Sequence, residues 1–325
     1  MTLTVAPQDA ALQAGVEVWR GGVNTWECDE MGHMNVRFYV ARSIEALIGL
    51  AAELGMPHAF SPDASATLRV REQHIRFLRE IRPPNPLHMI GAVVEMGETD
   101  ARLLLTLVHS LTGAPAASFQ IVVSHVTPGE GRAFAWPRAV RERALALTTA
   151  IPAYAAARSV SLAPLTVAAS PALADELGLA TISAGAIGAR ECDAFGRMSG
   201  EGFIGRISDG VGRLVSEVRA AIAGAAPTPP GRIGAAALEY RLAHLDWPRA
   251  GDRQVIRSGL IAIDQRIVTV AHWMLDPASG RPWGLAEAVI AALDLDSRKI
   301  VPIAPAAQAT LAQKIAVEAA LIKRG

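Results

Sequence analysis

The side chains best suited to chemistry lie close together near the start of the chain, in the segment ECDEMGHMN that spans residues 27–35. Glu27 and Asp29 supply carboxylates. His33 supplies an imidazole, and Asn35 supplies an amide. A carboxylate can attack a carbonyl carbon, or it can take a proton from a water molecule that does so. This cluster is therefore a candidate active site for acyl transfer.

The elements around the cluster suit that chemistry. We expect a strand over residues 15–26 and a buried helix over residues 36–54, because the latter stretch is apolar on nearly all sides and has no internal proline. Gly32 lies in the turn between them. The unpaired amides of the first helical turn would then face a substrate beside Asp29 and hold a developing oxyanion. The alternative is that Asp29 and Asn35 only cap the helix, as both residue types often do.

The same pattern occurs twice. Residues 191–214 read ECDAFGRMSGEGFIGRISDGVGRL and match residues 27–50, ECDEMGHMNVRFYVARSIEALIGL, without a gap. The order of expected elements around the two segments also matches. Strands are expected over 66–79, 87–96, 101–111 and 116–127 in the first copy, and over 235–244, 253–263, 266–275 and 283–294 in the second. The second copy has a helix over 200–223, and the copies end in helical segments over 137–148 and 305–323.

One helix and several antiparallel strands in each copy predict an α+β fold in which a sheet wraps a central helix, twice. The expected domains are residues 1–130 for the first repeat, 131–180 for a helix-containing linker, and 181–325 for the second repeat with its C-terminal helix. Two such repeats in one chain would act as an internal pseudo-dimer, which could itself form a homo-oligomer.

The motif resembles the signature of hotdog-fold acyl-CoA thioesterases of the 4-hydroxybenzoyl-CoA thioesterase type, Asp-x-Asp-x-x-Gly-His-x-Asn followed by an aromatic residue. The resemblance makes Asp29 the catalytic carboxylate, with Gly32 and His33 as the Gly-His pair. Asn35 and Tyr39 match the remaining two positions. The first Asp of the signature is a Glu in this sequence. The two copies together resemble the double-hotdog acyl thioesterases.

The resemblance also implies a substrate and its contacts. The acyl chain would lie in a tunnel between paired hotdog units, and the nucleotide of CoA would rest on basic side chains. The implied substrate-binding residues are Val36 and Tyr39 beside the motif, and the arginines Arg37, Arg79 and Arg82. The implied reaction is hydrolysis of an acyl-CoA thioester, with acyl carrier protein thioesters as the second choice and no cofactor.

The motif of the second copy has changed. Asp193 persists, but Arg197 stands in place of His33, Ser199 in place of the Asn, and Phe203 in place of the Tyr. A permanent cation beside Asp193 would favour its ionised form and could hold it in an ion pair. We expect Asp193 to be a structural remnant, with a second, altered site as the alternative.

Two other functions remain open. A hydratase or dehydratase acting on a 2-enoyl thioester uses the same fold and has Asp and His four residues apart, as Asp29 and His33 are, but with Asn-Pro between them. A protein that binds acyl thioesters without turning them over would need the motifs only as helix caps. Thiol release from an acyl-CoA would select the thioesterase, and stoichiometric binding without turnover would select the binding protein.

Composition narrows the class further. Basic and acidic residues balance at 31 each, which argues against nucleic acid and anionic membrane as partners. No segment approaches the roughly 18 apolar residues of a membrane helix, and the N-terminal segment lacks signal-peptide features. Cys28 and Cys192 lie far apart, a usage typical of a reducing compartment. We expect a cytoplasmic protein, and no metal site because no HExxH or similar motif occurs.

Overall fold

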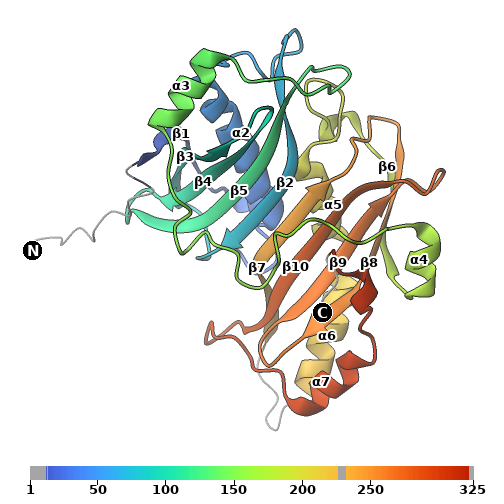
Figure 1. Ribbon diagram of the computed structural model, residues 1–325. Helices are drawn as coiled ribbons and strands as arrows, with labels where there is room; N and C mark the ends of the chain where they lie inside the picture. Colours follow the sequence, from blue (N-terminus) through green and yellow to red (C-terminus); the bar gives the residue numbers. More distant parts are fainter. Residues whose placement is uncertain (1–11, 13, 226–231, 322–325) are drawn as a thin grey trace, which may run out of the picture. The chain divides into compact units, whose positions relative to one another are not determined.

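The computed structural model describes residues 12, 14–225 and 232–321 of the 325-residue chain. The chain divides into two compact units, Met1–Ala156 and Ala157–Gly325 (Figure 1). Among the helices in the described residues, none combines the length and the apolar character that crossing a membrane requires.

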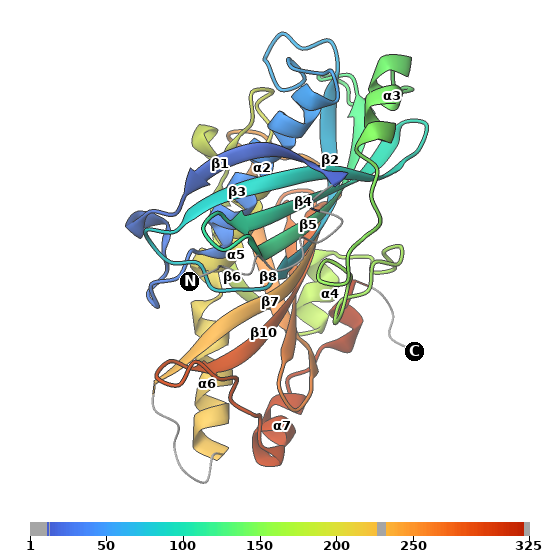
Figure 2. The same cartoon turned by 90° about the vertical axis from the view of Figure 1, so that its left-hand side faces the viewer.

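The first unit is a long helix packed on one antiparallel sheet. Its elements are β1 (Val16–Gly22), the 3-10 helix η1 (Thr25–Glu27), α2 (Val36–Glu53), β2 (Thr67–Phe77), β3 (Pro86–Met96), β4 (Asp100–His109), β5 (Ala114–Val126) and α3 (Arg138–Ala146). The strand order is β1-β3-β4-β5-β2. Helix α2 packs on β1, β3 and β4, and Figure 2 shows these strands curving past it. The predicted central helix and four strands of this copy are therefore confirmed.

The second unit repeats this plan. Its elements are α4 (Pro171–Glu176), β6 (Ala180–Ala186), the 3-10 helix η2 (Ala189–Glu191), α5 (Gly200–Gly210), α6 (Gly212–Ala225), β7 (Ile233–His244), β8 (Arg253–Ile263), β9 (Val268–Leu275), β10 (Pro282–Asp294), α7 (Pro305–Ala312) and the 3-10 helix η3 (Val317–Ala319). The strand order within the unit is β6-β8-β9-β10-β7, the same order as in the first unit.

Irregularities in strand pairing recur at matching places in the two sheets. The register of β1 against β3 shifts between Glu17 and Trp19, and β6 shifts against β8 at the equivalent point, 164 residues later. The shift after Val93 in β3 recurs 167 residues later, after Leu260 in β8. The remaining strand pairs also shift at equivalent positions. The repeat predicted from the motif thus extends through the whole sheet.

The helix of the second copy differs from the expectation. The sequence predicted one helix over 200–223, whereas the structure has two, α5 and α6, with Val211 between them. Gly210 and Gly212 flank Val211. A Cβ atom at Gly210 would lie 2.2 Å from the carbonyl oxygen of Ile182 in β6, but Gly49 of the continuous α2 approaches Val18 of β1 equally closely, so this approach is not itself the cause of the break. Glycine lowers helix stability by up to about 1 kcal/mol relative to alanine, which favours a break at this point.

The terminal helix is also shorter than expected. The sequence predicted a helix over 305–323, but α7 ends at Ala312, and residues 322–323 lie outside the described part of the chain. The chain leaves the helix because it pairs with β8. Ile315 forms a parallel bridge with Leu260, and the amide of Ala316 donates to the Leu260 carbonyl at 2.8 Å. Pairing with the sheet replaces the helical hydrogen bonds that would otherwise follow.

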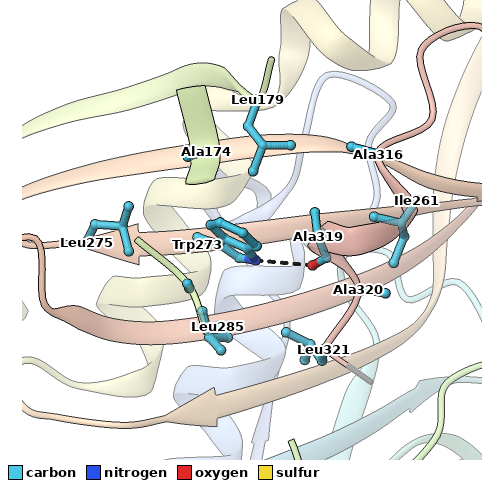
Figure 3. Close-up of a cluster of buried hydrophobic side chains, with 12 residues drawn as sticks. Ala174, Leu179, Ile261, Trp273, Leu275, Leu285, Ala316, Ala319, Ala320 and Leu321 are labelled. Atoms are coloured by element: carbon cyan, nitrogen blue, oxygen red, sulfur yellow. Dashed lines mark hydrogen bonds between the residues drawn. The ribbon is translucent and has the colours of Figure 1, made fainter. Parts of the chain in front are cut away.

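A buried apolar cluster covers one face of the second sheet (Figure 3). Trp273 of β9 lies in this cluster with Leu179 and Ala316, and its indole N–H donates to the carbonyl of Ala319 at 3.2 Å. The residues that precede β6 and those that follow α7 both contribute to the cluster. The cluster therefore anchors the chain just before the strand that leads into the second motif.

A polar pair lies inside the second unit. Ser258 of β8 pairs across the strands with His272 of β9, and its Oγ atom lies 2.7 Å from His272 Nδ1. The other ring nitrogen, Nε2, is buried and has no hydrogen-bond partner among the residues that the structure describes. Burial lowers the pKa of His272 to about 3, so the ring is neutral. The first unit has Gly91 and Leu105 at these positions, so the fold does not require the pair.

We predict that His272 makes the protein sensitive to acid. In the unfolded chain its pKa is near 6.5, and the folded ring resists protonation down to about pH 3. The unfolded state therefore binds more protons between these values, and stability falls by about 3 kcal/mol as the pH drops from 7 to 4. The double variant Ser258→Ala with His272→Leu, which adopts the leucine of the first copy, should lose less. The test is to measure the melting temperatures of the wild type and the double variant as a function of pH. An equal fall in the two melting temperatures between pH 7 and pH 4 would contradict the prediction.

Candidate active site

The segment between Cys28 and Met34 forms a tight turn ahead of α2, and these two residues pair as an antiparallel bridge. Within the turn, the amide of Asp29 donates to the carbonyl of His33 at 2.8 Å. The amide of Gly32 donates to the carbonyl of Asp29 at 3.0 Å. Gly32 has a φ of 75°, which glycine adopts without strain. The turn therefore fixes the backbone of the motif before any side chain is considered.

The two oxygens of the Asp29 carboxylate have different surroundings. Oδ1 accepts hydrogen bonds from the amides of Met31 at 2.9 Å and His33 at 3.1 Å. Oδ2 has no hydrogen bond or ion pair within the described residues, and the side chain is partly exposed. Asp29 is not the cap of α2. One oxygen anchors the carboxylate, and the other is bonded to no group among the described residues.

Asn35 is the residue that caps the helix. Its Oδ1 atom accepts from the amide of Arg37 at 2.9 Å, and its carbonyl accepts from the amide of Phe38 at 2.9 Å. The amide of Val36 donates to no acceptor in the part of the chain that the structure describes. Of the helix-start amides expected to hold an oxyanion, that of Val36 is therefore the one still available.

Glu27 is buried, although its position also suited a surface charge. Its Oε2 accepts from the backbone amide of Asn24 at 2.7 Å, and its Oε1 forms an ion pair with Arg42 from the second turn of α2. The Glu27 side chain is 3% exposed and that of Arg42 is 20% exposed. The pair joins the start of the motif to the helix, and it is a structural contact rather than a reactive one.

His33 lies between the motif and the connection from β2 to β3. Its Nε2 atom is 2.8 Å from Arg82 Nη2 and 3.1 Å from Glu80 Oε2. The connection is held in place by Ile81, whose carbonyl accepts from the amide of Met34 at 2.9 Å. The structure thus brings together two predicted residues, His33 and Arg82, with Glu80, which sequence reasoning did not single out.

The other predicted substrate contacts occupy different environments. Tyr39 is buried, its ring meets that of Phe77 edge-on at 5.0 Å, and burial raises the pKa of its hydroxyl. It therefore stays a neutral phenol within the core. Arg37 lies half-buried in the first turn of α2, and Arg79 and Arg82 are exposed on the connection after β2. The arginines, rather than Tyr39, are accessible to a soluble ligand.

The second copy has the same turn but a different carboxylate environment. Oδ1 of Asp193 accepts from the amides of Phe195 and Arg197, at 2.9 and 3.0 Å. Its Oδ2 is 3.3 Å from both Nε and Nη2 of Arg197, a side chain that is only 5% exposed. Gly196, with a φ of 74°, matches Gly32. The oxygen that is free in the first copy is therefore held by a guanidinium in the second.

The space beside the second motif is occupied by aromatic rings. His244 stacks on Trp247 with ring centroids 4.8 Å apart, and Phe203 meets His244 at 5.8 Å. The remaining cavity, lined also by Ser199, measures about 10 Å³, which holds about one water molecule. Trp247 occupies the position that Glu80 has in the first copy. In both copies, the carbonyl of the next residue in the chain accepts a hydrogen bond from the equivalent backbone amide of the motif. Arg249 matches Arg82 by the same alignment, so His33 and Glu80 are the two polar residues of this group that the second copy replaces.

The fold and the turn define a class: two α+β units, each with an acidic turn at the start of its central helix. The family model described as the thioesterase-like superfamily matches residues 23–144 and again residues 187–311. This chain therefore belongs to the thioesterase-like superfamily, as the motif predicted. That membership supports a thioester hydrolase activity.

Solved structures share the fold across both copies. A proposed oleoyl thioesterase from Lactobacillus plantarum has a TM-score of 0.64 at 10% identity, over 85% of this chain and 96% of its own. The 12:0-ACP thioesterase from Umbellularia californica has a TM-score of 0.62 at 10% identity, over 86% and 94%. An acyl-ACP thioesterase from Bacteroides thetaiotaomicron has a TM-score of 0.62 at 8% identity, over 86% and 99%. These likenesses show the fold and confirm the predicted tandem hotdog. No curated protein sequence gives a significant match.

Proposed function

We propose that this protein hydrolyses acyl-CoA thioesters in its first unit, with Asp29 as the catalytic carboxylate. The observation that carries the proposal is the environment of Asp29: Oδ1 is fixed by two backbone amides, and Oδ2 is not engaged by any described residue. A held but unpaired carboxylate at the start of a buried helix suits attack on a carbonyl group. Membership of the thioesterase-like superfamily makes the thioester the fitting substrate class.

The proposed reaction begins at the thioester carbonyl. Oδ2 of Asp29 takes a proton from a water molecule, and the water oxygen forms a bond to the carbonyl carbon. The Val36 amide donates to the oxyanion that develops. The carbon–sulfur bond then breaks, its electron pair leaves with sulfur, and the proton held by Asp29 is returned to give a carboxylic acid and a free thiol.

Direct attack by Asp29 is the alternative chemistry, and it gives a mixed anhydride in place of the water adduct. A single turnover in H₂¹⁸O addresses it. Water that attacks the anhydride at its aspartyl carbonyl leaves one ¹⁸O in the side chain, whereas a general base acquires none. Mass spectrometry of the peptide that contains Asp29 detects the difference, and label in that peptide would establish direct attack.

CoA is proposed as the carrier because of the arginines beside the motif. Arg79 and Arg82 are exposed on either side of Ile81, whose carbonyl is bonded to the motif. Guanidinium groups bind phosphate through paired N–H donors. Solved structures of the same fold include acyl-ACP thioesterases, so an acyl carrier protein thioester is the second candidate.

The test is a thiol-release assay with one acyl group on three carriers: CoA, pantetheine, and acyl carrier protein. We expect hydrolysis of the CoA and pantetheine thioesters, with a lower KM for CoA. Arg79→Gln should raise KM for acyl-CoA and leave that for acyl-pantetheine unchanged. If only the acyl carrier protein thioester were hydrolysed, that thioester would replace acyl-CoA as the proposed substrate.

Two results would replace the function itself. Loss of the conjugated double bond of a 2-enoyl-CoA without thiol release would identify a hydratase. Stoichiometric binding of acyl-CoA with no turnover of any carrier would identify a binding protein. Repeating the assay across acyl chain lengths and aromatic acyl groups would then define the acyl specificity.

A further inference from the structure

His33 presents one ring nitrogen to two groups of opposite character. Its Nε2 atom is within hydrogen-bond distance of the Arg82 guanidinium, at 2.8 Å, and of the Glu80 carboxylate, at 3.1 Å. The two partners are themselves 3.4 Å apart. The His33 side chain is only 11% exposed, so water competes weakly for this nitrogen. The second ring nitrogen, Nδ1, has no hydrogen-bond partner among the described residues.

Arg82 and Glu80 cannot both bond to Nε2 in the same state of the ring. A guanidinium only donates, and it therefore requires a bare Nε2, which places the ring proton on Nδ1. A carboxylate only accepts, and it therefore requires a proton on Nε2, which leaves Nδ1 as a base. Each tautomer of His33 thus has a ready partner, and neither leaves Nε2 unsatisfied.

This arrangement is absent from the second copy, where Arg197 and Trp247 occupy the positions of His33 and Glu80. The turn is the same in both copies, and the connection after the strand receives the same backbone hydrogen bond. Arg249 keeps the position of Arg82, so the fold forms without the pairing of His33 with Glu80. The presence of His33 and Glu80 in the copy with the free carboxylate points to a role in the reaction.

We infer that Glu80 and Arg82 are positioning residues that hold His33 in two alternating tautomers, and that His33 carries the proton to the leaving thiolate. The inference rests on the proposed function. In the Arg82-bound tautomer, the Nδ1 proton donates to the thioester carbonyl of the bound substrate. On exchange to the Glu80-bound tautomer, Nδ1 gives its proton to water and Nε2 takes one from water. Nδ1 is then bare, and it takes the proton that Asp29 removed from the attacking water and passes it to the sulfur. No net charge stays on the ring.

The test replaces the two partners separately. In Glu80→Ala the ring keeps only its Arg82 partner, so Nδ1 holds the proton and cannot carry another. We expect kcat to fall by about tenfold to a hundredfold with KM nearly unchanged, on the scale seen for groups that orient a catalytic ligand. Arg82→Ala should favour the opposite tautomer and raise KM for acyl-pantetheine, a substrate without phosphates on which Arg82 could act directly.

The spectroscopic signature is the ¹⁵N chemical shift of the two His33 nitrogens in the full-length chain. Wild type should show averaged shifts, Glu80→Ala a protonated Nδ1, and Arg82→Ala a protonated Nε2. Glu80→Gln keeps an acceptor and should retain more activity than Glu80→Ala. The exposed Glu130 provides a matched control, and Glu130→Ala should change neither shifts nor turnover.

The outcomes separate the two proposals. Wild type that releases no thiol from any carrier would overturn the proposed function, and the NMR shifts would still report on the tautomers. Active wild type with unchanged kcat and unchanged shifts in Glu80→Ala would overturn the positioning role and leave the proposed function in place. A fall in kcat without any change in the shifts would also overturn it, since the tautomers would then not depend on Glu80.

Discussion

Replacing Asp29 with asparagine is expected to lower the rate of thioester hydrolysis by about 10²- to 10⁴-fold, the usual contribution of a general base. The substitution retains a side-chain oxygen for the amides of Met31 and His33, which now bond to Oδ1. It replaces the free Oδ2 with an amide nitrogen that can neither attack nor accept a proton. Turnover should therefore be lost while the turn, and with it the fold, is preserved.

The second copy supplies the matched control. Asp193→Asn makes the same change at the equivalent turn, where the carboxylate is already engaged by Arg197. We expect turnover to change by no more than about twofold, because an ion-paired oxygen is not available as a base. Both variants should be assayed for thiol release, with circular dichroism to verify folding. Equal losses in the two variants would contradict the asymmetry, and a raised KM in Asp193→Asn alone would indicate a binding role for the second copy.

Much of the fold could be predicted from sequence because the signals are local and occur twice. The strands alternate with turn sequences, and an ungapped alignment of 24 residues, seven of them identical, fixes the correspondence of the remaining elements in the two copies. The break between α5 and α6 was not predicted, because the glycines on either side of Val211 weaken a helix without fixing where it ends. Contacts between elements that are far apart in sequence produce no periodic pattern in the sequence, so they could not be predicted either.

The candidate site was predictable only in part, for the same reason. Asp29 and Asn35 lie in a contiguous motif, and its spacing placed them at the helix start. The contact that Arg82 makes with His33 spans 49 residues, and Glu80 has no motif of its own. The burial of Glu27 depends on Arg42, which lies 15 residues further along on α2. Such partners become evident only when the connection after β2 and the helix are placed together.

The buried pair of Glu27 and Arg42 gives the largest expected effect on stability. Glu27→Gln keeps the size of the side chain and an oxygen for the amide of Asn24, but it removes the buried charge that faces Arg42 and leaves only the more exposed Glu45, at 2.6 Å, to compensate it. Removing one member of a buried ion pair typically costs about 3 kcal/mol or more, and because Glu45 still offsets part of the Arg42 charge we expect a cost of about 3 kcal/mol.

The equivalent pair in the second unit tests whether burial is the cause. Glu191 bonds to Arg206 at 2.6 and 2.7 Å, but its side chain is 19% exposed, against 3% for Glu27. Water can therefore compensate the guanidinium in part, and Glu191→Gln should cost closer to about 1 kcal/mol. Hydrogen exchange of the α2 and α5 amides in the full chain measures each unit separately. Equal losses of protection in the two helices would show that the difference in burial between the pairs has no energetic consequence.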